Sequence, residues 1–411
     1  MLPGMTTWSV VKDDTKEKRR PGRYFRYGIL ASLALLVISL GLALTPGQPP
    51  EAPEPSFSER ARASALAETM HLRTAGSLLA DSVSGAERQA LLRTVTLLTT
   101  QARALSGPDQ KPPPAATAAA SGTASGEPSA SAPVNGEPVV ADSPAGLVAA
   151  VSASGTRRLK DAEASDGGMA RLLAAVGTAQ LIQASSLAPA VGATAPELPV
   201  LPAPSPAPAA AAAASPSAAS LPAASPAAGE SSCPPAPAAS GPAAGSATTA
   251  TALAMTVKTE AETVYGYQVA LARLDGAAAG SASQLLARHE SVLAEAEALS
   301  RAQCVDIPPR EAGYTLGPLF LESPAAGLGS LEAGTLPVYG DLVALSDGGI
   351  RQWAIAGLLA AANRAAQWGA DSGPLPGIVV DTAQLPELAT DSPAPESTAP
   401  GASPPPSDAG Q

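Results

Sequence analysis

Two ionisable side chains that fall inside otherwise apolar helical stripes are the residues best suited to chemistry. Glu260 lies on a stripe that runs from Val257 to Tyr267 in steps of three and four residues, and His289 interrupts the next such stripe. Burying a carboxylate or an imidazole is costly unless the group is paired, hydrogen-bonded or bound to a metal. These two residues, together with Glu332 next to the stripe of a later predicted helix, are therefore the candidate site.

Carboxylates beside an imidazole suggest a metal site. The number of available ligands indicates which metal site, if any, the residues could form. A di-iron helical bundle uses a Glu from each of two helices and a Glu-x-x-His pair from each of the other two. Here Leu286 stands three residues before His289, and the last predicted helix has neither Glu nor His. A single iron or manganese ion on Glu260, His289 and Glu332 is the alternative. The ligand count favours a polar core without a cofactor, in which Glu260 hydrogen-bonds His289 or Tyr339.

Other motifs in the chain point to no reaction. Glu68-x-x-His71 has the spacing of a ligand pair, but Glu163 is the one Glu on the predicted helices that face it, so we expect a solvated Glu and a partly exposed His. The sequence shows no Ser-His-Asp order, no phosphate-binding glycine loop and no zinc helix motif. We therefore assign no catalytic and no cofactor-binding residue, and we predict a protein that is not an enzyme.

The helices that would position the candidate site form an all-α unit over residues 247–370. Two helical stripes are followed by a connection from Cys304 to Glu322, a helix after Ser323-Pro324 and a last helix after Asp347. A helix of about 22 residues is about 33 Å long, and some 20 extended residues can span that length. One long crossover is the ferritin-like arrangement of a four-helix bundle.

A second helical unit precedes this one. Capping signals at Ser56, Ser84, Pro144 and Asp166 predict four helices within residues 56–187, interrupted by a disordered insert at 107–141. A Pro/Ala/Ser linker at 188–246 is expected to separate the two units, and an acidic tail is predicted at 371–411. We predict from this linker that the two units fold as separate bodies.

The N-terminal segment has the pattern of a membrane anchor. A basic stretch at residues 1–27 precedes an uncharged apolar run from Gly28 to Leu44, which predicts a transmembrane anchor at 28–45. Positive charge before the run places the N-terminus in the cytoplasm and the bulk of the chain outside. The alternative is a secreted protein whose signal peptide is cleaved near Gly41-Leu42-Ala43.

Composition excludes several classes of partner. The formal net charge of −11 argues against nucleic-acid binding, which needs a basic face. The chain has 43 Pro and 37 Gly with 3% aromatic residues, so a large part cannot be packed core. Cys233 and Cys304 are too few for a disulfide framework and lack zinc spacing.

The second unit also resembles a known family, on residues spread over its four predicted helices and the crossover. These are the run from Glu260 to Tyr267, His289, Tyr314 to Leu316, Glu332, Arg351 and Trp368. Over residues 249–377 the chain is similar to the ferritin-like domain of unknown function found in actinobacterial exported or membrane-anchored proteins. Members usually have a His where this chain has Ala261, so the resemblance implies the fold more than a metal site.

These observations lead to one functional expectation and one alternative. We expect a membrane-anchored extracytoplasmic ferritin-like protein that serves as a non-catalytic interaction or structural module and contacts another protein of the cell envelope. The alternative is a metal-binding ferritin-like protein that holds iron or manganese with a reduced set of ligands.

Overall fold

The computed structural model describes residues 22–44, 54–107, 141–199 and 247–388. Within these residues the secondary structure is helical throughout, with no strand, which confirms the predicted all-α class. The chain divides into two compact units, Met1–Pro55 and Ser56–Gln411. Residues 108–140 of the predicted insert, most of the predicted linker at 188–246 and the end of the tail lie outside the described residues.

The first compact unit contains one helix, α1, at Gly22–Leu44. It begins six residues before the predicted apolar run, because the aromatic residues that precede Gly28 are also helical. The apolar segment Phe25–Val37 is shorter than a full membrane span, and its side chains are exposed, with Phe25 at 72% and Leu35 at 70%. This helix therefore has an apolar surface that its own unit does not cover.

One helix of the described chain meets the length and hydropathy of a membrane span. It is α5, at Gly167–Ala190, and 67% of its most apolar stretch is buried among other helices. A helix that is apolar on all sides and buried by protein is typical of the core of a helical domain. We interpret α5 as a core helix on this ground.

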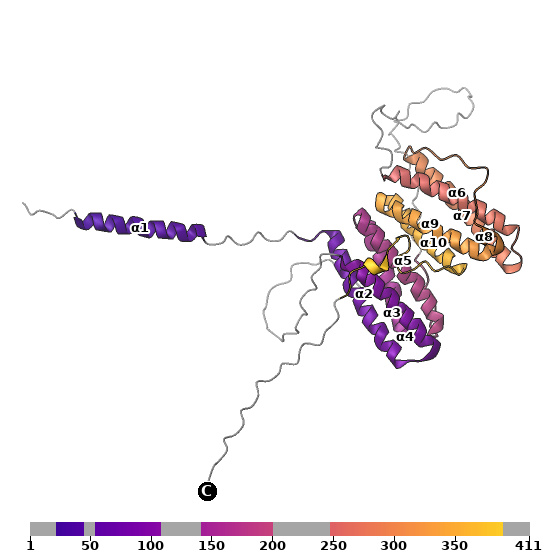
Figure 1. The fold of residues 1–411 in the computed structure, drawn as a ribbon, viewed down its shortest axis with the longest axis horizontal. Coiled ribbons are helices and arrows are strands. Elements are labelled where there is room, and N and C mark those ends of the chain that lie inside the picture. The colour runs from indigo at the N-terminus through magenta and orange to yellow at the C-terminus, as the bar shows by residue number, and fades with distance from the viewer. Residues whose placement is uncertain (1–21, 45–53, 108–140, 200–246, 389–411) are drawn as a thin grey trace, which may run out of the picture. The chain divides into compact units, whose positions relative to one another are not determined.

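The second compact unit begins with four long helices, shown in indigo to magenta in Figure 1. They are α2 (Phe57–Ser82), α3 (Gly85–Ser106), α4 (Pro144–Ala164) and α5. The predicted capping box is present at the start of α2, where Ser56 and Glu59 bond each other's backbone N–H. Ser84 precedes α3 as predicted but makes no side-chain capping bond.

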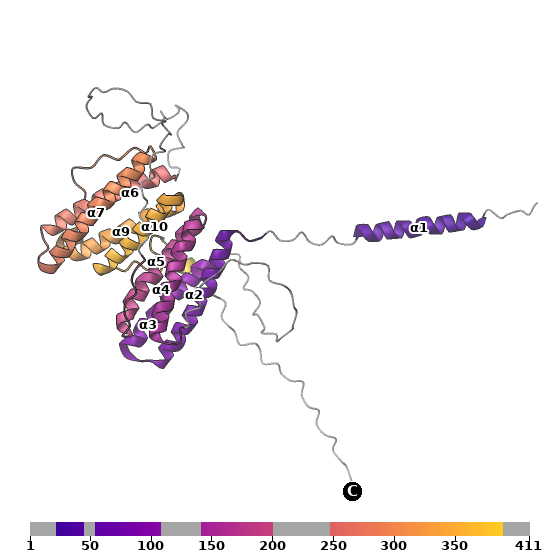
Figure 2. The same ribbon diagram turned by 180° about the vertical axis from the view of Figure 1, so that it is seen from behind.

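Four further long helices and one short one follow, shown in orange to yellow in Figures 1 and 2. They are α6 (Thr249–Leu271), α7 (Gly276–Ala302), α8 (Pro318–Glu322), α9 (Pro324–Leu345) and α10 (Gly348–Gln367), with a short 3₁₀ turn at Thr382–Gln384. The helix α8 falls within the predicted crossover, in which no helix is expected. Figure 2 shows α6, α7, α9 and α10 packed alongside one another.

The contacts between helices fix their directions. Thr249 at the start of α6 donates to the carbonyl of Leu345 at the end of α9, whereas Tyr267 near the end of α6 bonds Glu332 early in α9. The two helices are therefore antiparallel. Because the α6–α7 turn reverses the chain, α7 and α9 run parallel, and the connection between them crosses the length of the bundle. The predicted crossover is confirmed.

The first four helices run in the same pattern of directions as α6, α7, α9 and α10. The Ser58 side chain accepts from the backbone of Asp166, while Glu68 pairs with Arg157, so α2 and α4 are antiparallel. Thr94 of α3 likewise bonds Gln183 of α5. The helices α3 and α4 therefore run parallel.

The two sets of four helices are not separate bodies. One hydrophobic core contains Leu173 and Val176 of α5 together with Leu336 of α9 and Leu358 of α10. Two further contacts join them: the guanidinium of Arg351 donates to the carbonyl of Ser165, and a Cβ added to Gly167 would overlap the carbonyl oxygen of Ala344. The prediction that the two helical units fold as separate bodies was wrong. The composition of the linker does not determine whether the apolar faces of α5 and α10 pack against each other.

The segment after α10 also packs, although an unstructured tail is predicted from residue 371. Leu375 is buried, and the carbonyl of Gly377 accepts from Arg171 of α5 at 3.2 Å. Arg103 of α3 donates to the carbonyls of Leu385 and Pro386 at 2.7 and 2.9 Å. The segment therefore packs against α3 and α5, where the two arginines donate to its backbone carbonyls.

Candidate functional site

The three residues of the predicted site meet in the middle of the second set of helices. His289 of α7 is fully buried, and its Nδ1 lies 2.8 Å from Glu260 Oε2 of α6. Its Nε2 lies 2.8 Å from Glu332 Oε1 of α9. The imidazole is therefore held between two carboxylates, one at each ring nitrogen.

A fourth charged group completes this cluster. Arg364 of α10 is 5% exposed, and its Nε donates to both oxygens of Glu332, at 3.0 and 2.9 Å. We call Glu260, His289, Glu332 and Arg364 the charged quartet. Each of the four helices contributes one member, so the quartet joins all four helices.

Two tyrosines and a tryptophan supply the outer hydrogen bonds of the quartet. The hydroxyl of Tyr339 donates to Glu260 Oε1 at 2.5 Å, and that of Tyr267 donates to Glu332 Oε1 at 2.6 Å. Trp368 Nε1 then donates to the Tyr267 oxygen at 2.8 Å. Each carboxylate of the quartet is thereby bonded to an imidazole nitrogen and to a phenol.

The charge states follow from this geometry. Burial alone lowers the pKa of His289, but the hydrogen bonds to Glu260 and Glu332 outweigh it and raise the pKa above the ordinary value. Burial raises the pKa of Glu332, yet the bond from His289 and the charge of Arg364 bring the net pKa below its usual range. Burial raises the pKa of Tyr339 well above normal, so this phenol stays protonated and donates.

The quartet is electrically balanced. Two carboxylates accept at both ring nitrogens, which requires an imidazolium, because a neutral ring has one N–H. Two negative charges, on Glu260 and Glu332, then face two positive charges, on His289 and Arg364. A buried set of charges is costly unless it is paired. Here the charges are paired, and each carboxylate accepts from at least two donors.

The donor set does not fit a metal ion as it stands. Both ring nitrogens of His289 are committed to carboxylates on opposite sides of the ring, so neither lone pair is free for coordination. Arg364 already supplies a positive charge 2.9 Å from Glu332. Among the described residues no group of three or more His, Cys, Asp or Glu side chains is arranged to hold a metal.

Of the quartet, Glu260, His289 and Glu332 were predicted, and the hydrogen bonds expected from Glu260 to His289 or Tyr339 both occur. Arg364 was missed. It stands four residues before Trp368 and eleven after Trp353, on the same stripe of α10, which is the signal that identified Glu260 and His289. An arginine on such a stripe can also extend its long side chain to water, so the stripe alone does not identify Arg364 as a partner.

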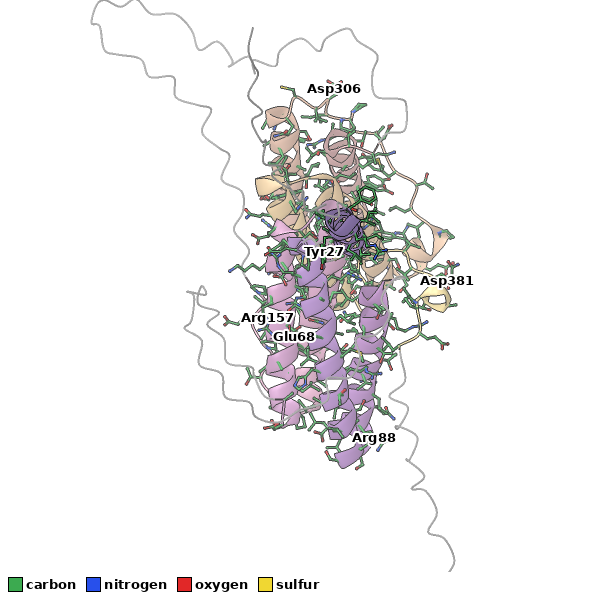
Figure 3. All side chains as sticks on the ribbon, turned by 90° about the vertical axis from the view of Figure 1, so that its left-hand side faces the viewer. Tyr27, Glu68, Arg88, Arg157, Asp306 and Asp381 are labelled. Carbon is green, nitrogen blue, oxygen red and sulfur yellow. The ribbon has the colours of Figure 1, made fainter. Side chains whose placement is uncertain are left out.

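The second motif of the sequence forms no site. His71 is exposed, and Glu68 pairs with Arg157 and, at 3.6 Å, with Arg158 (Figure 3). Glu163 instead accepts from Gln352 of α10 at 3.0 Å. Glu68 is therefore not the solvated residue expected from the sequence but an ion-pair partner of α4, whereas His71 lies on the surface.

One comparison with known proteins bears on this region. Residues 252–380 match the family model described as a domain of unknown function, DUF4439. The matched residues contain all four members of the charged quartet and the crossover. No curated protein and no solved structure matches the chain. The predicted resemblance to a domain of unknown function is confirmed for these residues, which are less than half of the chain.

The stability of the protein should depend on pH through the quartet. The pKa of His289 is raised above 6.5 on folding, so its contribution to stability is complete below about pH 6.5 and is lost as pH rises through the folded pKa. The pKa of Glu332 is lowered from 4.5, so its contribution is present above about pH 4.5 and is lost as pH falls through the folded pKa. Urea unfolding from pH 3 to 9 should therefore show a plateau at about pH 4.5–6.5.

The decline of the unfolding free energy at alkaline pH is the part of this prediction that depends on His289. A variant without the Glu260–His289 pair should lose the decline of unfolding free energy above about pH 6.5 that the wild type shows. Equal slopes in the two proteins would mean that His289 does not change its proton affinity on folding.

Proposed function

We propose that residues 247–370 form a ferritin-like bundle whose centre is a structural salt-bridge cluster, and that the protein is a membrane-anchored, extracytoplasmic, non-catalytic module of the cell envelope. The observation that carries this proposal is the charged quartet. Its imidazole is occupied at both nitrogens, and Arg364 provides the positive charge that a metal would otherwise supply. The parallel pair α7 and α9 with its long crossover supports the ferritin-like part.

Two features support the location outside the cell. The apolar side chains of α1 are exposed, which suits a helix that lies in lipid, and basic residues precede it in the sequence. Cys304 is disulfide-bonded, and the chain's other cysteine, Cys233, lies outside the described residues. Disulfides persist in oxidising compartments and are rare in the cytosol.

A module of this kind acts through its surface rather than through its centre. The quartet links four helices and leaves no reactive group free, so its effect is to fix the bundle. The partner we propose is another protein of the envelope.

Metal dependence tests the non-catalytic part. We expect the full chain, purified in detergent, to keep its melting temperature when ferrous iron, manganese or zinc is added, because a ligand raises that temperature only if it binds the folded state. A rise that disappears in His289→Ala but persists in Glu290→Ala, a change at an exposed neighbour, would instead make this a metalloprotein with a reduced ligand set.

Location is tested separately. A reporter that is active only in the cytoplasm should be silent when fused after Gln411, whereas a reporter that needs export should be active. The reverse result would contradict the proposed topology and leave the interpretation of the quartet unaffected.

A further inference from the structure

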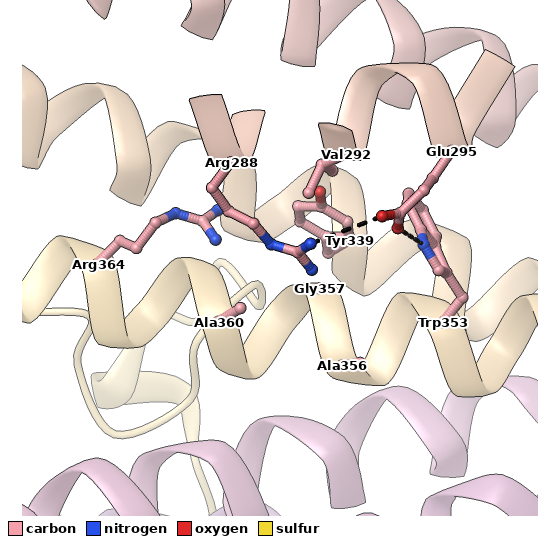
Figure 4. Close-up of a pocket in the computed structure, with 9 residues that line it drawn as sticks. All are labelled: Arg288, Val292, Glu295, Tyr339, Trp353, Ala356, Gly357, Ala360 and Arg364. Atoms are coloured by element: carbon pink, nitrogen blue, oxygen red, sulfur yellow. Dashed lines mark hydrogen bonds and ion pairs between the residues drawn. The ribbon is translucent and has the colours of Figure 1, made fainter. Parts of the chain in front are cut away.

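A small pocket lies between α7 and α10 beside the quartet (Figure 4). Its volume is about 80 Å³, and one water molecule needs about 10–15 Å³. The pocket therefore admits several waters or a ligand of a few heavy atoms. It is lined by charged, aromatic and small apolar side chains: Arg288, Glu295, Arg364, Tyr339, Trp353, Val292, Ala356, Gly357 and Ala360.

The donor that most needs a partner belongs to Arg364. Its Nε is bonded to Glu332, but its Nη2 is buried and has no hydrogen-bond partner among the described residues. A buried donor without an acceptor costs the full desolvation of that group. Since Arg364 lines the pocket, an acceptor bound there would lie next to this guanidinium.

The other polar groups of the pocket define what kind of acceptor fits. Glu295 is already held, by Trp353 Nε1 at 2.9 Å and by Arg288 Nη1 at 3.6 Å. The hydroxyl of Tyr339 is committed to Glu260. The groups left for a ligand are thus the guanidiniums of Arg288 and Arg364. The charge of Arg364 is balanced within the quartet and that of Arg288 by Glu295, so what a ligand can use is N–H donors rather than an excess of charge.

The rest of the lining includes small and apolar residues. A Cβ at Gly357 would overlap the ring of Tyr339, so glycine at this position lets that ring lie against α10. Ala360 and Val292 add apolar surface. A ligand that matches these walls has a charged head for the arginines and a short apolar end.

We propose that this pocket binds a small monocarboxylate, with its carboxylate on Arg364 and Arg288 and its apolar end against Val292 and Ala360. Guanidinium groups bind planar carboxylates through paired N–H donors. The site is separate from the quartet's internal bonds, so the proposal does not depend on whether the bundle is catalytic.

Acetate is the probe for this proposal. The full chain in detergent should show saturable acetate binding in ligand-observed NMR at constant ionic strength, with chloride as the balancing salt. Arg288→Gln should weaken that binding about tenfold or more, because it removes one charged donor from outside the quartet. Ala360→Leu should abolish binding by filling the pocket while leaving every charge in place.

A matched control is available on the same helix. Arg301 is about half exposed like Arg288, at 53% against 55%, and is ion-paired with Glu297. Arg301→Gln should bind acetate as the wild type does. The proposal fails if wild-type binding is absent, if Arg301→Gln and Arg288→Gln weaken it equally, or if inorganic phosphate binds and acetate does not.

Discussion

Glu332→Ala is expected to lower the free energy of unfolding by about 3–5 kcal/mol, as the removal of one partner from a buried ionic cluster commonly does. Glu332 is fully buried and accepts from His289, Arg364 and Tyr267. Without it, two buried positive charges face one carboxylate, and the Tyr267 hydroxyl loses its acceptor. No other single change in the described chain removes so many bonds of the quartet.

Chemical denaturation of the full chain measures this effect, with the midpoint and slope compared in wild type and variant. Glu290→Ala serves as the control, because Glu290 is exposed and directly follows His289, and it should change the unfolding free energy by less than about 0.5 kcal/mol. A cost for Glu332→Ala no larger than that of the control would show that the quartet is not buried as described.

Glu260→Ala should also cost about 3–5 kcal/mol, whereas removing its partners together should cost little. In the triple variant E260M/H289M/Y339F the Glu260–His289 pair leaves as a neutral unit, and the phenol that donates to Glu260 leaves with it. The remaining Glu332–Arg364 pair stays balanced. Replacing buried ion pairs by apolar residues of similar volume is often neutral or stabilising.

The comparison of these two variants separates two explanations of the quartet. If Glu260→Ala is far less stable than E260M/H289M/Y339F, the cost of the single change comes from buried polar groups that have lost their partner. If the triple variant is the less stable, the ionic bonds themselves stabilise the fold, and our interpretation of the quartet as a balanced, replaceable core would be wrong.

Much of the helical layout could be predicted, because the signals are local. The capping residues Ser56, Pro144 and Asp166 mark helix starts that the structure reproduces. The crossover followed from lengths alone, since the chain between α7 and α9 is long enough to span a helix. Such inferences need no knowledge of which helices touch.

The joint packing of the two sets of helices could not be predicted in this way. The linker at 188–246 is a property of the chain, whereas the shared core depends on which faces of α5, α9 and α10 meet. An apolar stripe shows that a face is buried but not what buries it. The same limit applies to residues 371–388, whose carbonyls find arginine donors on helices far away in the sequence.

The candidate site was predicted in part for a related reason. Glu260 and His289 break apolar stripes, and a buried ionisable residue needs a partner. The stripes could not identify Arg364 as that partner, because an arginine at the edge of a stripe can also extend its long side chain to water. The charge balance of the quartet becomes evident when the four helices are placed together.

The protonation state of His289 tests the central claim most directly. Long-range ¹H–¹⁵N NMR of the full chain with labelled histidine, in a His71→Gln background that leaves one signal, reports on both ring nitrogens. We predict an imidazolium with both nitrogens protonated at pH 6.5, unchanged by added zinc. A neutral ring at that pH, or a ring nitrogen whose resonance shifts on binding zinc, would contradict the charged quartet and favour a metal site.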